Sequence, residues 1–68
     1  MQGTQRQYDL KQVRALANLT QKQTAKLLNV HPNTYHKLEQ TPGLMTLDQA
    51  WIIAEAAGIG VEQIKTTA

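Results

Sequence analysis

Cysteine is missing from this chain of 68 residues, and proline and glycine are scarce. Without cysteine the chain can form neither a disulfide nor a metal site with thiolate ligands. No apolar run approaches the roughly 20 residues of a membrane-spanning helix, and the polar residues 1–7 contain no apolar segment that could act as a signal sequence. The sequence therefore predicts a soluble intracellular protein.

Catalytic groups are lacking as well. The motifs of the chain supply no paired carboxylates and no nucleophile with a neighbouring base, so we expect that it is not an enzyme. His31 and His36 are five residues apart, which would place them on different faces of one helix. Because no carboxylates cluster beside them, we expect no metal site. Nothing in the sequence indicates a cofactor or a small-molecule effector.

The apolar residues that are present recur three and four positions apart, and no segment alternates as a strand would. A chain below roughly 70–80 residues gains only about 3–5 kcal/mol from a single core. Tight helix packing and self-association are the remaining sources of stability. The pattern predicts a compact all-α domain over residues 8–66, preceded by a flexible tail over residues 1–7.

Five segments carry the helical pattern. Their expected bounds are Tyr8–Ala17, Gln21–Leu28, Pro32–Glu39, Leu47–Ala57 and Val61–Thr66. Thr20 with Gln23, and Thr46 with Gln49, have the three-residue spacing of a capping box. Asn29 suits the left-handed conformation that ends a helix. The expected core stripe of the fourth helix is Leu47, Ala50, Ile53, Ala54 and Ala57.

Charge is unevenly distributed, although the net charge is only +2. Residues 1–37 contain six of the seven basic side chains and one acidic one, whereas residues 38–68 contain one basic and four acidic ones. Such asymmetry is typical of a chain that meets a polyanion on one side. A solvated surface on which the charges segregate explains the pattern equally well, so charge alone does not decide.

Two short helices joined by a three-residue turn lie between Thr20 and Glu39. The residues of the second helix that are expected to point away from the core are Pro32, Asn33, His36 and Lys37. The major groove of DNA admits one α-helix, whose first residues then meet the base edges. Asn33 could bond adenine through N6 and N7, and Lys37 could donate to guanine O6 and N7. The segment therefore predicts a DNA-binding helix-turn-helix.

The chain resembles the lambda Cro and phage repressor (XRE-type) helix-turn-helix proteins over about Leu10 to Ile64. The residues that carry the resemblance are Leu19-Thr20-Gln21, Ala25, Leu28-Asn29-Val30, Leu38-Glu39, Leu47, Ala54 and Gly58-Ile59. The resemblance implies five helices, a recognition helix over residues 32–39, and a homodimer that binds a palindromic DNA operator. It also implies a place in the cytoplasm of a bacterial or phage-infected host cell.

The resemblance implies roles for single residues. Gln21 matches the family's glutamine that contacts a DNA phosphate at the start of the second helix. Arg14 and Glu39 match a recurring ion pair that ties the first helix to the end of the recognition helix. Both residues would also lie near the edge of the core, where the loss of one partner is costly.

The base-reading positions of the family correspond to Pro32, Asn33 and Lys37, but the chain departs from the family pattern nearby. Thr24 stands in place of a leucine, and we expect its hydroxyl to bond a carbonyl of the preceding turn. His31 replaces a serine or threonine cap. Pro32 replaces a long polar reader, so it can only contact a thymine methyl or position Asn33. Base reading then rests on Asn33, His36 and Lys37.

Several residues have two readings. Lys22 and Lys26, four residues apart, face either a phosphate or water. Arg6 lies either in a disordered tail or in an arm that reaches the DNA backbone or minor groove. Trp51 is either partly buried at the flank of the core stripe or, together with Ile52, a dimer contact. A single exposed apolar residue such as Ile52 would be ordinary.

The sequence as a whole favours a sequence-specific transcriptional regulator, a small phage-type or prophage-type repressor that occupies its operator as a dimer. The alternative is a protein-interaction module on the same fold, such as an antitoxin-like fragment or a phage adaptor that docks on a host protein. The apolar pair Trp51 and Ile52 keeps this alternative open.

Overall fold

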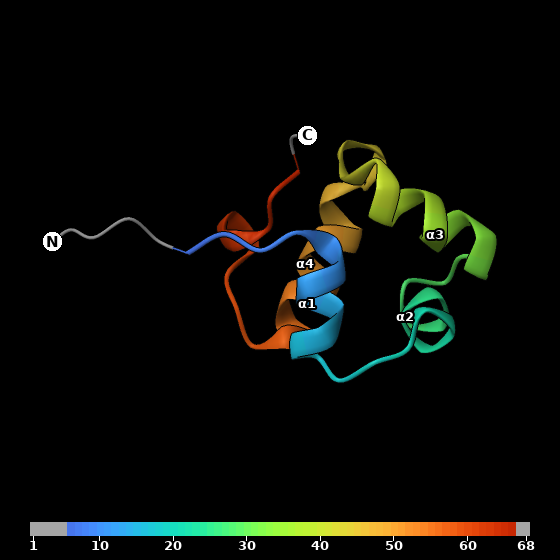
Figure 1. Cartoon of the computed structure of the whole chain (residues 1–68), viewed down its shortest axis with the longest axis horizontal. Coiled ribbons are helices and arrows are strands. Elements are labelled where there is room, and N and C mark those ends of the chain that lie inside the picture. Colours follow the sequence, from blue (N-terminus) through green and yellow to red (C-terminus); the bar gives the residue numbers. More distant parts are fainter. Residues whose placement is uncertain (1–5, 67–68) are drawn as a thin grey trace, which may run out of the picture.

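Four α-helices and two short 3-10 turns build the fold in the computed structural model, which describes residues 6–66 (Figure 1). Their bounds are α1 Leu10–Leu16, α2 Gln21–Leu27, α3 Pro32–Gln40, η1 Pro42–Leu44, α4 Leu47–Ala57 and η2 Val61–Gln63. The predicted all-α class is confirmed, since the described residues contain no strand. Residues 1–5 of the predicted tail lie outside the described residues.

The first helix begins two residues later than predicted because Asp9 is its N-cap. The Asp9 carboxylate accepts the Gln12 backbone N–H at 2.8 Å, and the Gln12 side-chain oxygen accepts the Asp9 backbone N–H at 3.0 Å. This reciprocal capping box sets the start of α1 at Leu10. Beyond the end of the helix, Asn18 takes the left-handed conformation with φ of 59°, which a short polar side chain tolerates.

The two helices of the predicted helix-turn-helix begin where the sequence places them. Thr20 Oγ1 accepts the Gln23 N–H at 3.0 Å, and Gln23 Oε1 accepts the Thr20 N–H at 2.9 Å, as the capping box requires. Asn29 takes φ of 59° in the turn. His31 Nδ1 accepts the Asn33 N–H at 3.0 Å, so the imidazole caps α3. This helix runs one residue further than predicted.

The prediction of a fifth helix is wrong, and the prediction of five helices with it. After Gly58 ends α4 with φ of 73°, residues 61–63 form only a 3-10 turn. Ile64 then forms a parallel β-bridge with Tyr8, in which the Tyr8 N–H donates to Gln63 O and the Lys65 N–H donates to Tyr8 O, both at 2.8 Å. Backbone groups that a helix would pair internally are thus satisfied by the N-terminal segment.

One core joins all four helices. Its buried apolar side chains are Leu10, Val13, Ala25, Leu28, Tyr35, Leu38, Ala50, Ile53, Ala54 and Ile64. Thr24 is also buried, and its hydroxyl donates to Thr20 O at 2.8 Å, which is the expected bond to the preceding turn. The prediction that Leu47 belongs to the core stripe is wrong. Leu47 is 71% exposed, because it is the first residue of α4 and buried packing begins at Ala50.

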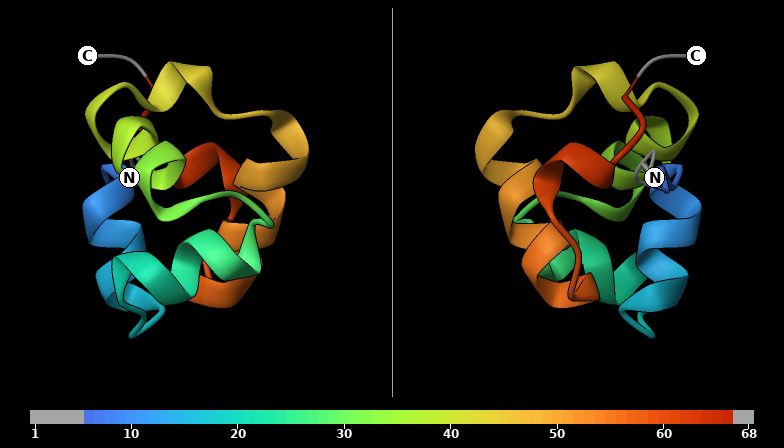
Figure 2. Two further views of the ribbon diagram at one scale, coloured as in Figure 1. Left: turned by 90° about the vertical axis from the view of Figure 1, so that its right-hand side faces the viewer. Right: turned by 90° about the vertical axis from the view of Figure 1, so that its left-hand side faces the viewer.

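The helices are arranged in two packed pairs. Helix α2 packs against α3, and α1 packs against α4. In the left view of Figure 2, α2 crosses the front of the molecule between α1 and α4, and α3 lies above it. The helix-turn-helix therefore forms one side of the domain, with α1 and α4 behind it. Within residues 6–66 no helix has both the length and the apolar character needed to cross a membrane.

Candidate nucleic-acid interface

The outer face of α3 is polar and open to solvent. Tyr35 and Leu38 point inward and are buried. The exposed side chains of the helix are Pro32, Asn33, Thr34, His36, Lys37 and Gln40. Three of the residues predicted to read bases, Asn33, His36 and Lys37, are thus exposed at spacings that place them on neighbouring turns. Their amide, imidazole and ammonium groups are the donors and acceptors that match base edges in the major groove.

Gln40 extends this face and was not predicted. A hydrogen bond of 3.1 Å joins the Nε2 atoms of His36 and Gln40. The spacing of four residues was the available signal, but the predicted helix stopped at Glu39. The other histidine, His31, is occupied as the cap of α3. No group of three or more His, Cys, Asp or Glu side chains that could hold a metal occurs in the described part of the chain.

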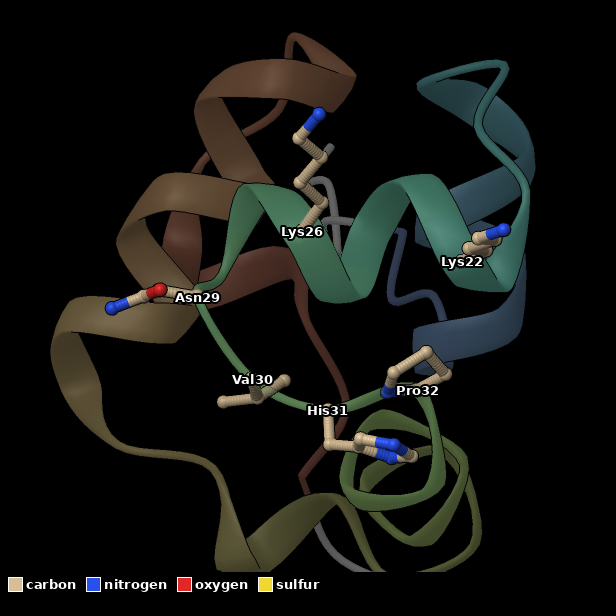
Figure 3. A pocket seen from close by; sticks show the side chains of 6 residues that line it. All are labelled: Lys22, Lys26, Asn29, Val30, His31 and Pro32. Carbon is tan, nitrogen blue, oxygen red and sulfur yellow. The ribbon is translucent and has the colours of Figure 1, made fainter.

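A groove separates α2 from the start of α3. It is lined by Lys22, Lys26, Asn29, Val30, His31 and Pro32 (Figure 3). This lining includes two ammonium groups and no carboxylate. In Figure 3, Lys22 lies over Pro32, whereas the Lys26 side chain points away from His31 and Pro32. Lys22 is therefore the α2 lysine that lies nearer to the outer face of α3.

A polar network lies beneath this surface and is centred on the Glu39 carboxylate. Arg14 Nε donates to Glu39 Oε2 at 2.6 Å, and the Tyr35 hydroxyl donates to the same oxygen at 2.7 Å. Gln21 Nε2 donates to Glu39 Oε1 at 2.8 Å. Arg14 also donates to Leu19 O at 3.2 Å. The ion pair expected from the sequence is therefore present, and the side chain of Glu39 is only 8% exposed.

The charge states of the network follow from burial and from these bonds. Burial alone would raise the pKa of Glu39, but hydrogen bonds from Arg14, Tyr35 and Gln21 outweigh it and hold the pKa below its usual value. Burial, followed by the bond to Glu39, raises the pKa of the Tyr35 hydroxyl. The hydrogen bond to Glu39 raises the pKa of Arg14. At neutral pH the network holds a carboxylate, a guanidinium and a neutral hydroxyl.

Gln21 is the predicted site residue whose surroundings differ most from expectation. The resemblance implied that Gln21 contacts a phosphate, whereas one N–H of its side chain is already bonded to Glu39. The side chain remains partly exposed and lines the grooves on both sides of it. Sequence reasoning paired Glu39 with Arg14 alone and missed Tyr35 and Gln21 as further donors.

Large apolar side chains are exposed on and beside α4. Trp51 is 56% exposed and Ile52 is 39% exposed, and Leu44 and Leu47 are more exposed still. Trp51 lies one turn after Leu47, so these two share a flank of the helix. Arg6 is exposed too, with its guanidinium carbon 5.6 Å from the centroid of the Tyr8 ring.

A family model described as a helix-turn-helix matches residues 10–64, which is most of the chain. Neither the curated proteins nor the solved structures contain a match to this chain.

Proposed function

Because the chain belongs to the lambda Cro and phage repressor (XRE-type) helix-turn-helix family of DNA-binding domains, we propose that it is a sequence-specific transcriptional regulator. The observation that carries this proposal is the exposed polar face of α3. In the proposed complex α3 lies in the major groove, where Asn33, His36 and Lys37 meet the base edges. Pro32 contacts a thymine methyl or positions Asn33.

Phosphate contacts come from α2 in this proposal. Gln21 and Lys22 begin the helix and lie beside the start of α3, as the grooves that they line indicate. With roughly three to five phosphate contacts in each half-site, the logarithm of the affinity falls with the logarithm of salt by about 0.9 for each contact. The excess of basic side chains in residues 1–37 supports this orientation.

The proposed regulator acts as a homodimer on a palindromic operator and represses transcription by occupying it. Two recognition helices would then lie about 34 Å apart, one turn of DNA. Trp51 and Ile52 are the proposed dimer contact, since large apolar side chains gain by leaving water. Sedimentation that finds only monomer, both with and without DNA, would remove the dimer from the proposal.

Selection of bound sequences from random DNA tests the proposal most directly, because it reports binding, any palindrome and the half-site spacing together. Asn33→Ala and Lys37→Ala should each weaken binding to the selected site by about 1–3 kcal/mol and relax specificity at one position. Lys22→Ala should lower the salt slope by about 0.9. Lys26→Ala is the charge-matched control on the same helix and should have a smaller effect. Unchanged affinity in the α3 variants would show that α3 does not read the site.

A second function, a protein-interaction module on the same fold, is favoured by the exposed Trp51 and Ile52. An antitoxin-like fragment or a phage adaptor would use these side chains to dock on a partner protein. Salt dependence separates the two functions. DNA binding should weaken steeply between about 50 and 200 mM salt, whereas hydrophobic docking should not.

A further inference from the structure

The Glu39 carboxylate on α3 forms a hydrogen bond with the side chain of Gln21 on α2. It lies at the end of α3 and accepts a hydrogen bond from the side-chain amide of Gln21, the first residue of α2, at 2.8 Å. Arg14 and Tyr35 both donate to its other oxygen. Each carboxylate oxygen therefore has its own partners, and the oxygen bonded to Gln21 receives no other hydrogen bond from a described side chain.

The chemistry of this contact fixes which way the Gln21 amide points. A carboxylate accepts hydrogen bonds and cannot donate one, so the NH2 end of the amide must face Glu39. Three donors around Glu39, one of them the Arg14 guanidinium, keep the carboxylate ionised although its burial opposes the charge. One N–H of Gln21 is taken by Glu39. Because the amide is planar, the direction of its second N–H follows from the first.

We propose that Glu39 is a positioning residue for DNA binding, which orients the Gln21 amide so that its second N–H donates to a backbone phosphate. The inference rests on the proposed function. It assigns one of the proposed phosphate contacts to Gln21 at the start of the helix-turn-helix, and the orientation of that side chain to Glu39 at its end. Gln21 is partly exposed and lines the groove that also contains Lys22 and Pro32, which places its side chain beside the proposed phosphate site.

The isosteric substitution Glu39→Gln distinguishes a role of Glu39 in orienting Gln21 from a role in packing alone. In Glu39→Gln the single remaining oxygen is required by Arg14 and Tyr35, which donate to one side of the group. The new NH2 group then faces Gln21, and two NH2 groups cannot bond each other. Gln21 is expected to turn its oxygen toward residue 39 and lose the orientation that suits a phosphate.

The test measures binding of the full chain to a random-sequence duplex at low salt, because a phosphate contact does not depend on sequence. Glu39→Gln should weaken binding roughly tenfold, as expected for the loss of one hydrogen bond to a charged group. In a Gln21→Ala background the same substitution should change affinity by less than about twofold. Gln21 is uncharged, so the salt slope should stay constant while the affinity falls.

Tyr35→Phe is the matched control, since it removes a bond to the other oxygen of Glu39 and leaves the Gln21 contact intact. It should lower the melting temperature without the tenfold loss of affinity. The side-chain NH2 resonances of Gln21 in the free protein give a readout without DNA, and they should move in Glu39→Gln but not in Tyr35→Phe.

The two ways of failing can be told apart. Full additivity of Glu39→Gln and Gln21→Ala, or equal loss of affinity in Tyr35→Phe, would overturn the positioning role while DNA binding stands. Unmoved Gln21 resonances in Glu39→Gln would overturn it as well. If the unmodified chain fails to bind any duplex at low salt, the proposed function and this inference both fall.

Discussion

Replacing Arg14 by alanine should destabilise the domain strongly. The substitution removes the 2.6 Å contact to Glu39 and the bond to Leu19 O, and leaves a carboxylate that is only 8% exposed without its counter-charge. Breaking a buried ion pair costs about 3–5 kcal/mol. Because Tyr35 and Gln21 still donate to the carboxylate, we expect a smaller loss of about 2–3 kcal/mol.

Such a loss is large for this chain, since a core of this size supplies only about 3–5 kcal/mol. For a domain of 60–100 residues each kcal/mol shifts the melting temperature by about 4–8 °C, so Arg14→Ala should melt on the order of 10–20 °C below the unmodified chain. Lys11→Ala is the control: it removes the same charge from the exposed side of α1 and should change the melting temperature little. Thermal denaturation followed by circular dichroism measures both. If the two variants melt within about 4 °C of each other, the ion pair between Arg14 and Glu39 does not stabilise the fold.

Three further predictions concern stability. The lowered pKa of Glu39 means that its contribution is present above the unfolded-state value of about 4.3 and is lost as pH falls through the folded-state value. Denaturant titrations should therefore show a free energy of unfolding that declines below about pH 4 in the unmodified chain and less so in Glu39→Gln; parallel curves would contradict this. Gly58→Ala should lower the free energy of unfolding by about 1 kcal/mol, because φ is 73°. The added Cβ would meet nothing within 4 Å, so a steric clash contributes nothing to this loss. Gly43→Ala, where φ is not positive, should cost less, and equal losses would refute a conformational cause. Tyr8→Pro deletes the N–H that donates to Gln63 O and the ring that packs against the core. It should lower stability by more than the roughly 1 kcal/mol of the hydrogen bond alone, and an unchanged melting temperature would contradict this.

The helix-turn-helix was readable from the sequence because its signals are local. Thr20 and Gln23 are three residues apart and bond each other's backbone N–H groups. Asn29 takes the left-handed conformation that its short side chain tolerates. A contact between residues this close in sequence depends little on the rest of the chain, so its spacing alone predicts it.

The errors fall where distant segments decide the local structure. The late start of α1 is the exception, because Asp9 and Gln12 have the same three-residue spacing as Thr20 and Gln23, and their capping box could have been predicted. The end of the chain carries apolar residues at helical spacing, yet Ile64 pairs with Tyr8 across the fold. The bond from Gln21 to Glu39 is another long-range contact, and no periodicity within one helix could have indicated it.

The exposure of single side chains was also only partly readable. The spacing of Leu47 fits the core stripe of α4, but a stripe does not say where along the helix the neighbouring elements stop. Site residues on α3 were placed by the same periodicity, and the four that were expected to point away from the core, Pro32, Asn33, His36 and Lys37, are exposed. Which bases Asn33 and Lys37 read stays a prediction.

The bridge between Tyr8 and Ile64 has a consequence for how the domain folds. It closes a loop that contains every helix, and the entropic cost of that closure is met only once the segments between are already ordered. The bridge should therefore form late in folding and be among the first contacts to open. Hydrogen exchange at the Tyr8 and Lys65 amides, whose protons lie in the two bonds of the bridge, should report one opening event shared by both ends of the domain.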